Sequence, residues 1–78
     1  MVTLTHKTAE YTAMAENFLA DCRLSLQDVK TGADAWAIAH RAGITQDAYQ
    51  DREITDAHIK TVLQRIFPNA VFRDKYTY

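Results

Sequence analysis

Residues that break or cross-link a chain are scarce in this sequence. Its 78 residues include one proline, two glycines and one cysteine. A single cysteine cannot form an internal disulfide, and the start carries no secretory signal pattern, so we expect a cytoplasmic protein. No apolar run approaches the ~20 residues of a membrane-spanning helix. With 47% hydrophobic and 24% charged residues, the composition is that of a globular chain and excludes a disordered or fibrous one.

An excess of one charge sign is also missing. The formal net charge is -1, which excludes the strong general attraction to nucleic acid or anionic membranes that a basic domain has. The charges are nevertheless separated along the chain. Segment 44–58 sets four acidic residues against one arginine, and segment 59–78 sets four basic residues against one aspartate. This asymmetry can be neutralised inside the fold or can steer a partner.

Motifs for catalysis or metal binding are absent as well. Ser25 is the only serine and lies in no activating motif, and the two glycines are isolated. The candidate metal ligands are scattered singly: His6, His40, His58 and Cys22. Asp47 and Asp51 are four residues apart and could share a proton or cation, but two solvated carboxylates are the favoured interpretation. We therefore expect no enzyme, no cofactor and no metal.

Apolar residues recur every three or four positions, which predicts an all-α fold, a small single-domain bundle of three to four helices. A first helix is expected over about 8–24, with an apolar face formed by Tyr11, Met14, Ala15, Phe18, Leu19, Cys22 and Leu26. On that face Cys22 would be a buried, inert thiol. Phe18, Ile38 and Leu63 are the expected core residues.

Capping residues place the other helices. Thr31 and Asp34 open a second helix over about 33–42, which Gly43 ends in a left-handed conformation. Thr45 is expected to cap a short third helix. Thr55 caps a fourth over about 56–67, before Pro68. The domain spans 1–78, and its apolar and aromatic tail, 70–78, is expected to pack back or to bind a partner.

The centre of the chain resembles a helix-turn-helix motif. Ala39 stands where two helices would cross, Gly43 follows four residues later, and Ile38, Ala42 and Ile44 flank them. The resemblance covers about 20 residues and departs from the motif at Arg52, where a core apolar residue is usual. It implies DNA contacts by Gln46, Asp47, Gln50 and Asp51 in the groove, with Arg52 and Lys60 nearest the phosphates. Two aspartates there would repel DNA.

We therefore expect a small non-enzymatic module that binds another protein, as accessory or inhibitor proteins of phages and mobile elements do. The expected binding residues combine steering charges with aromatic anchors: Asp47, Tyr49, Asp51, Glu53, Tyr76 and Tyr78. Two alternatives stay open. One is a helix-turn-helix regulator that contacts DNA through Gln46, Gln50, Arg52 and Lys60. The other is a structural homodimer.

Overall fold

The computed structural model describes residues 4–72 and confirms the all-α expectation. The helices are α1 (Thr8–Asp21), α2 (Gly32–Arg41), α3 (Ile44–Ala48) and α4 (Asp56–Ile66), and two 3-10 turns, η1 (Thr5–Lys7) and η2 (Leu26–Asp28), precede α1 and α2. The described residues contain no strand beyond one isolated parallel bridge between Thr31 and Val71. Helix α2, the Gly43 turn and α3 form the helix-turn-helix-like central pair.

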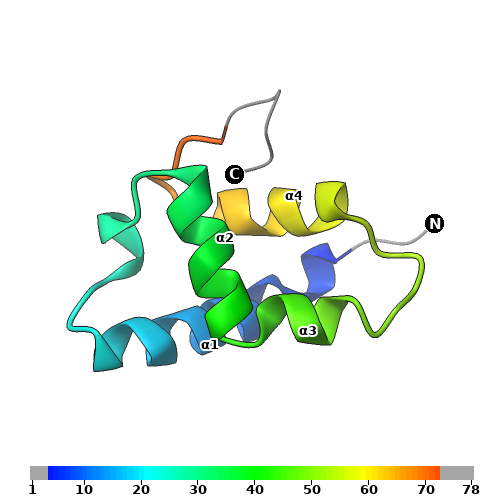
Figure 1. Cartoon of the computed structure of the whole chain (residues 1–78), viewed down its shortest axis with the longest axis horizontal. Helices are drawn as coiled ribbons and strands as arrows, with labels where there is room; N and C mark the ends of the chain where they lie inside the picture. Colours follow the sequence, from blue (N-terminus) through cyan, green and yellow to red (C-terminus); the bar gives the residue numbers. More distant parts are fainter. Residues whose placement is uncertain (1–3, 73–78) are drawn as a thin grey trace.

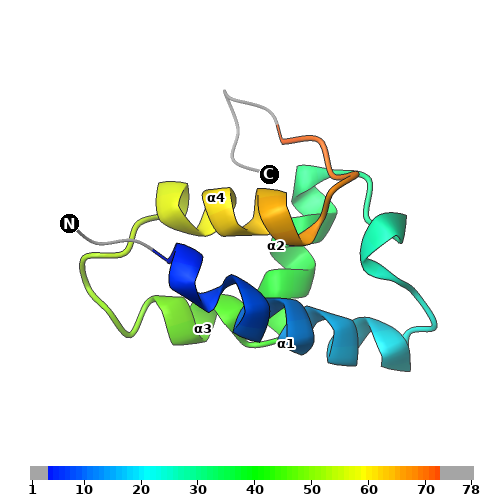
Figure 2. The same ribbon diagram turned by 180° about the vertical axis from the view of Figure 1, so that it is seen from behind.

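The helices pack around one core. Figures 1 and 2 show α4 running alongside α1, with α2 crossing both and α3 continuing from the end of α2. Each helix contributes an inward stripe of fully buried side chains, among them Tyr11, Ala15, Leu19, Ala35, Ala39, Ile44, Ile59 and Leu63. The alanines in these stripes let the helix backbones approach closely. Leu63 is core as expected, whereas Phe18 and Ile38 are half-buried at the margin.

Two threonines set the starts of α2 and α4 close to the expected positions. The Asp34 amide donates a hydrogen bond to Thr31 Oγ1 (3.1 Å), which satisfies a donor that the first turn would otherwise leave open. At α4, Thr55 and His58 form a reciprocal capping pair, in which the Thr55 amide donates to His58 Nδ1 (3.0 Å).

The end of α1 differs from the expectation. The helix stops at Asp21, because the chain turns into the left-handed region at Arg23 (φ 60°). The Arg23 amide donates to the Ala20 carbonyl (3.1 Å) and the Leu24 amide to the Leu19 carbonyl (2.9 Å), a Schellman turn. Cys22 consequently lies beyond the apolar face and is exposed, so its expected burial was wrong.

The turn into α3 confirms one expectation and corrects another. Gly43 adopts the left-handed conformation (φ 87°). It also occupies the N-cap position that we assigned to Thr45, since α3 begins at Ile44. Thr45 is instead buried within the helix, and its Oγ1 lies 3.4 Å from His40 Nδ1. The short connection leaves no room for a separate capping residue after the glycine.

The first part of the tail packs back onto the start of α2. The Val71 amide donates to the Lys30 carbonyl (3.1 Å), and the Gly32 amide donates to the Val71 carbonyl (2.9 Å). Phe72 follows against Gly32, so close that a Cβ on Gly32 would meet the ring at 2.9 Å. Tyr76 and Tyr78 lie outside the described residues.

Candidate binding surfaces beside helix α2

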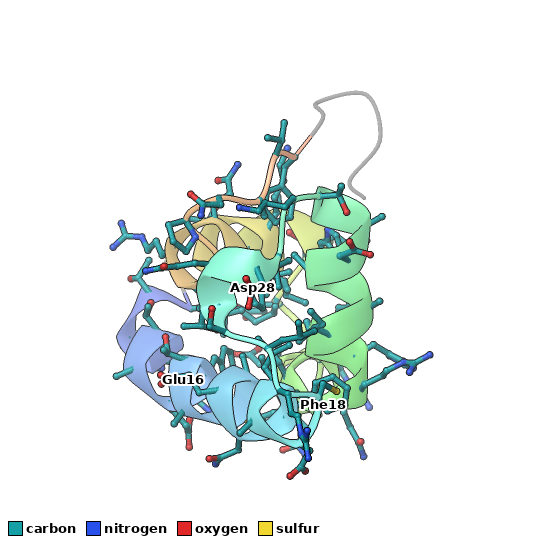
Figure 3. All side chains as sticks on the ribbon, turned by 90° about the vertical axis from the view of Figure 1, so that its left-hand side faces the viewer. Glu16, Phe18 and Asp28 are labelled. Atoms are coloured by element: carbon teal, nitrogen blue, oxygen red, sulfur yellow. The ribbon has the colours of Figure 1, made fainter. Side chains whose placement is uncertain are left out.

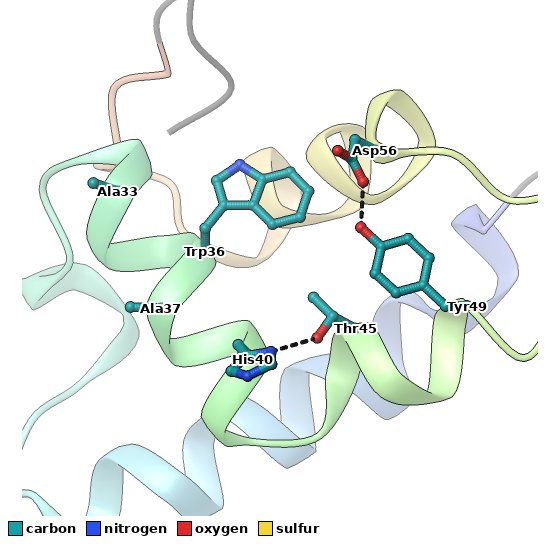
Figure 4. A pocket seen from close by; sticks show the side chains of 7 residues that line it. All are labelled: Ala33, Trp36, Ala37, His40, Thr45, Tyr49 and Asp56. Atoms are coloured by element: carbon teal, nitrogen blue, oxygen red, sulfur yellow. Dashed lines mark hydrogen bonds between the residues drawn. The ribbon is translucent and has the colours of Figure 1, made fainter.

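A shallow groove of about 510 Å³ lies between α2, α3 and the start of α4. Figure 4 shows the side chains that line this Trp36 groove: Ala33, Trp36, Ala37, His40, Thr45, Tyr49 and Asp56. Helix α2 supplies four of them because positions 33, 36, 37 and 40 share one side of a helix. The groove therefore lies next to the inward stripe of α2, on the outer surface of the helix pair.

Apolar surface dominates this groove. The Trp36 indole forms its wall and is 9% exposed, while Ala33 and Ala37 leave space beside the ring. Across from Trp36, Tyr49 is 47% exposed, and its hydroxyl donates a hydrogen bond to Asp56 Oδ1 (Figure 4). This bond fastens the end of α3 to the start of α4. The groove thus has an aromatic wall and a rim that carries one carboxylate.

Acidic residues flank the Tyr49 side. Asp51 and Glu53 are exposed in the loop between α3 and α4, where the Glu53 amide donates to Asp51 Oδ1 (3.0 Å). Three of the expected binding residues are therefore exposed on one short segment: Tyr49, Asp51 and Glu53. Asp56, at the start of α4, adds a third carboxylate to this part of the surface.

Asp47 points away from this group. Its Oδ2 accepts hydrogen bonds from Lys7 Nζ (2.8 Å) and the Tyr11 hydroxyl (2.6 Å), which join α3 to η1 and α1. The Lys7 ammonium and the Tyr11 hydroxyl hold the pKa of Asp47 below its usual value, and burial together with Asp47 raises the pKa of Tyr11. Asp47 is thus engaged with Lys7 and Tyr11, whereas Asp51 accepts a hydrogen bond from the Glu53 amide.

The positions implied by the helix-turn-helix resemblance are spread out. Helix α3 has five residues and ends before Gln50, so Gln50 and Arg52 lie in the following loop. Gln46 is exposed on α3, and Lys60 lies half-buried on α4. A protein that recognises bases in the major groove of DNA needs several side chains from one helix. Helix α3 carries only Gln46 and Asp47 from this set, and Asp47 is bonded to Lys7 and Tyr11. DNA binding stays a prediction.

A second hollow of about 410 Å³ lies beside the next stripe of α2, which shares Ala37 with the Trp36 groove. We call it the Phe18 hollow. Helix α2 lines it with Asp34, Ala37, Ile38 and Arg41, and the facing wall consists of Phe18, Cys22, Leu24, Asp28 and Val29. Figure 3 shows Phe18 where α1 approaches α2, while Glu16 points to the outer side of α1. Leu24 is 48% exposed at the edge.

The sequence-based prediction named Tyr49, which lines the Trp36 groove, but it named neither Trp36 and His40 nor the residues of the Phe18 hollow as binding residues. These surfaces depend on how α2 is rotated against three other elements. The small or charged residues at positions 33, 34, 37 and 41 are the sequence signal for the outward sides of α2, and the structure places all four at the exposed surface.

Comparisons with known proteins assign no family or function to this chain. No family model matches the chain, and neither the curated proteins nor the solved structures compared with it give a match. Within residues 4–72, no three potential metal ligands gather, and no helix is long and apolar enough to span a bilayer.

Proposed function

We propose that the protein is a small non-enzymatic module that binds a segment of another protein in the Trp36 groove. The observation that carries the proposal is the composition of this groove, an aromatic wall with a half-exposed tyrosine opposite. Aromatic anchors beside a polar rim are the residues that protein interfaces favour. The two alanines leave the space that an incoming side chain needs.

The charges around the groove define the partner segment. Asp56 lies on the rim, and Asp51 and Glu53 are exposed in the adjoining loop, with Arg52 as the one nearby cation of that loop. A segment that places an aromatic or long aliphatic side chain next to Lys or Arg satisfies both features. The apolar side chain fills the space beside Trp36, and the basic residue approaches the acidic rim and speeds association.

The hydroxyl, imidazole and carboxylate groups of the groove are already engaged with one another, which favours binding over catalysis. Tyr49 donates to Asp56, and Thr45 lies at hydrogen-bond distance from His40. Their role is to hold the walls of the groove in place. A module of this kind acts by occupying a partner, as the accessory or inhibitor proteins of phages and mobile elements do.

Selection from a random peptide display library tests the proposal. Trp36 is the only tryptophan of the chain, so its fluorescence reports occupation of the groove. We expect enriched peptides to combine an aromatic or aliphatic anchor with Lys or Arg and to change this fluorescence.

The variant Ala33→Arg places a cation in the groove at an exposed helical position, and Ala13→Arg is the matched exposed control on α1. The first variant should lose at least tenfold in affinity for the selected peptides, roughly 1.4 kcal/mol, and the second should retain it. Peptides that bind both variants equally, or that are rich in Asp and Glu, would overturn the proposal.

A further inference from the structure

We propose that a second copy of this chain docks on the Phe18 hollow, with α2 of one copy antiparallel to α2 of the other across a two-fold axis. This interface is distinct from the peptide site, because it uses the adjacent stripe of α2, about a quarter turn further round the helix. The two surfaces share only Ala37 at their common border. The inference therefore stands independently of the proposed function.

The first support is the spacing along α2. Positions 34, 37, 38 and 41 follow the i, i+3, i+4, i+7 pattern, so they form one outward stripe. Asp34 and Arg41 are its ends, about 10 Å apart along the axis at 1.5 Å per residue. The midpoint falls between Ala37 and Ile38. A two-fold axis through that midpoint brings each Asp34 opposite the partner copy's Arg41.

The second support is charge. Among the described residues, neither Asp34 nor Arg41 forms an ion pair. In an isologous interface a contact between positions i and j occurs twice, so the antiparallel arrangement makes two opposite-charge pairs at once. A parallel arrangement would instead put like charges together. The stripe is therefore complementary to itself in one orientation only.

The third support is the apolar surface between the charges. Ala37 lies at the crossing point, where a small side chain lets two helices approach closely. Ile38 and Phe18 are half-buried beside it, and Leu24 protrudes at the edge with 48% of its surface exposed. The interface thus has an apolar centre and charged ends, the usual arrangement of a protein contact.

Charge reversal distinguishes this interface from a general loss of stability. Asp34→Arg alone brings two arginines together at each end, and Arg41→Asp alone brings two aspartates together. By sedimentation equilibrium, each variant should self-associate about tenfold or more weakly than the parent chain. A mixture of the two variants should recover at least the parental affinity, because every end then pairs Arg with Asp. Damage to the fold of either variant would not be repaired by mixing.

Glu16→Arg is the matched control, since Glu16 is exposed on the outer side of α1 and should not affect association. A parent chain that remains monomeric up to about 1 mM would overturn the proposal, as would reversal variants that associate like the parent. So would a mixture that associates no better than its two components.

Disulfide trapping provides a second readout. With Cys22 replaced by Ser, Ala37→Cys places one thiol beside the axis and should give a disulfide-linked dimer under mild oxidation. Ala13→Cys in the same background is the exposed control on α1 and should remain monomeric. Equal cross-linking of both variants would contradict an axis at Ala37.

Discussion

Two turns of this molecule share a local backbone conformation and differ in the burial of the residue that follows. The turn after α1 has Arg23 in the left-handed region, followed by Leu24, which is 48% exposed. The turn after α2 has Gly43 in the left-handed region, followed by Ile44, which is fully buried. The backbone reverses similarly in both, so local conformation alone does not decide burial. The neighbouring helices decide it.

The difference follows from where each turn leads. Beyond Gly43 the chain enters α3 at once, and Lys7 and Tyr11 hold that helix against α1 through Asp47. Beyond Arg23 the chain runs to η2, where the Ser25 amide and hydroxyl both donate to Asp28 Oδ2 (2.8 and 3.1 Å), a pairing within four residues. One turn therefore closes the core, and the other places an aliphatic side chain at the rim of a hollow.

Truncating the two aliphatic residues tests this contrast most strongly. Ile44→Ala should cost about 2 to 4 kcal/mol, because it leaves a cavity in the core. Leu24→Ala should cost well below about 1 kcal/mol in the dilute chain, since half of the side chain already contacts water. Urea unfolding followed by circular dichroism measures both. Similar costs at the two positions would contradict the difference in burial.

Substituting the glycine tests the backbone of the second turn. Gly43→Ala should cost about 1 to 2 kcal/mol, because a φ of 87° strains a residue with a Cβ. The new Cβ would meet only Met14 Cε at 3.8 Å, an ordinary contact, so packing adds little to this cost. Gly43→Asn should cost less than Gly43→Ala, since asparagine tolerates the left-handed region. Urea unfolding that gives the opposite order would show that sterics dominate.

Removing the Asp47 charge tests the joint that fixes the second turn. Asp47→Asn should cost about 1 kcal/mol at neutral pH, allowing for the partial exposure of the carboxylate. Because the pKa of Asp47 is lowered in the fold, its contribution is present above the unfolded value of about 3.9 and is lost as the pH falls through the lower folded value. The stability difference between parent and variant should therefore shrink below about pH 4.

Thermal unfolding between acidic and neutral pH checks this dependence. Asp51→Asn is the matched control, because Asp51 is exposed and its carboxylate accepts a hydrogen bond from the Glu53 amide of the same loop. It should leave the unfolding temperature nearly unchanged across the range. A difference for Asp47→Asn that persists at the acidic end would assign the loss to shape rather than to charge.

The sequence was sufficient for elements that carry their own capping residues. Helices α2 and α4 begin where Thr31 and Thr55 predict, and Gly43 marked its turn, because each signal acts within a few residues. The end of α1 was not predictable in this way, since arginine has no intrinsic preference for the conformation that Arg23 adopts. The burial of the residues around it failed for the same reason, with Cys22 expected inside and found outside.

The candidate surfaces were harder to predict than the fold. Tyr49 was predicted because an aromatic residue beside acidic residues in the sequence is typical of a binding surface. Asp47 was placed with them, although its partner Lys7 is 40 residues away. Sequence spacing cannot show such a contact. Nor could it show which sides of α2 face the solvent, because Trp36 and Ile38 are both apolar and line two different surfaces.

Replacing the arginine of the first turn gives the smallest expected effect and the opposite sign. Arg23→Gly should relieve about 1 to 2 kcal/mol of left-handed strain and lose about 0.5 to 1 kcal/mol through the greater freedom of glycine in the unfolded chain. The net result is a gain of several tenths of a kcal/mol, or a few degrees in unfolding temperature for a domain of this size. Arg23→Ala retains the strain and should show no gain. Both variants keep the backbone hydrogen bonds to Ala20 and Leu19 and the position of Leu24, so self-association should not change. If Arg23→Gly instead lowers the unfolding temperature, contacts of the arginine side chain stabilise this turn by more than the strain of its left-handed backbone destabilises it. The two turns would then differ in side-chain contacts as well as in the burial of the residue that follows.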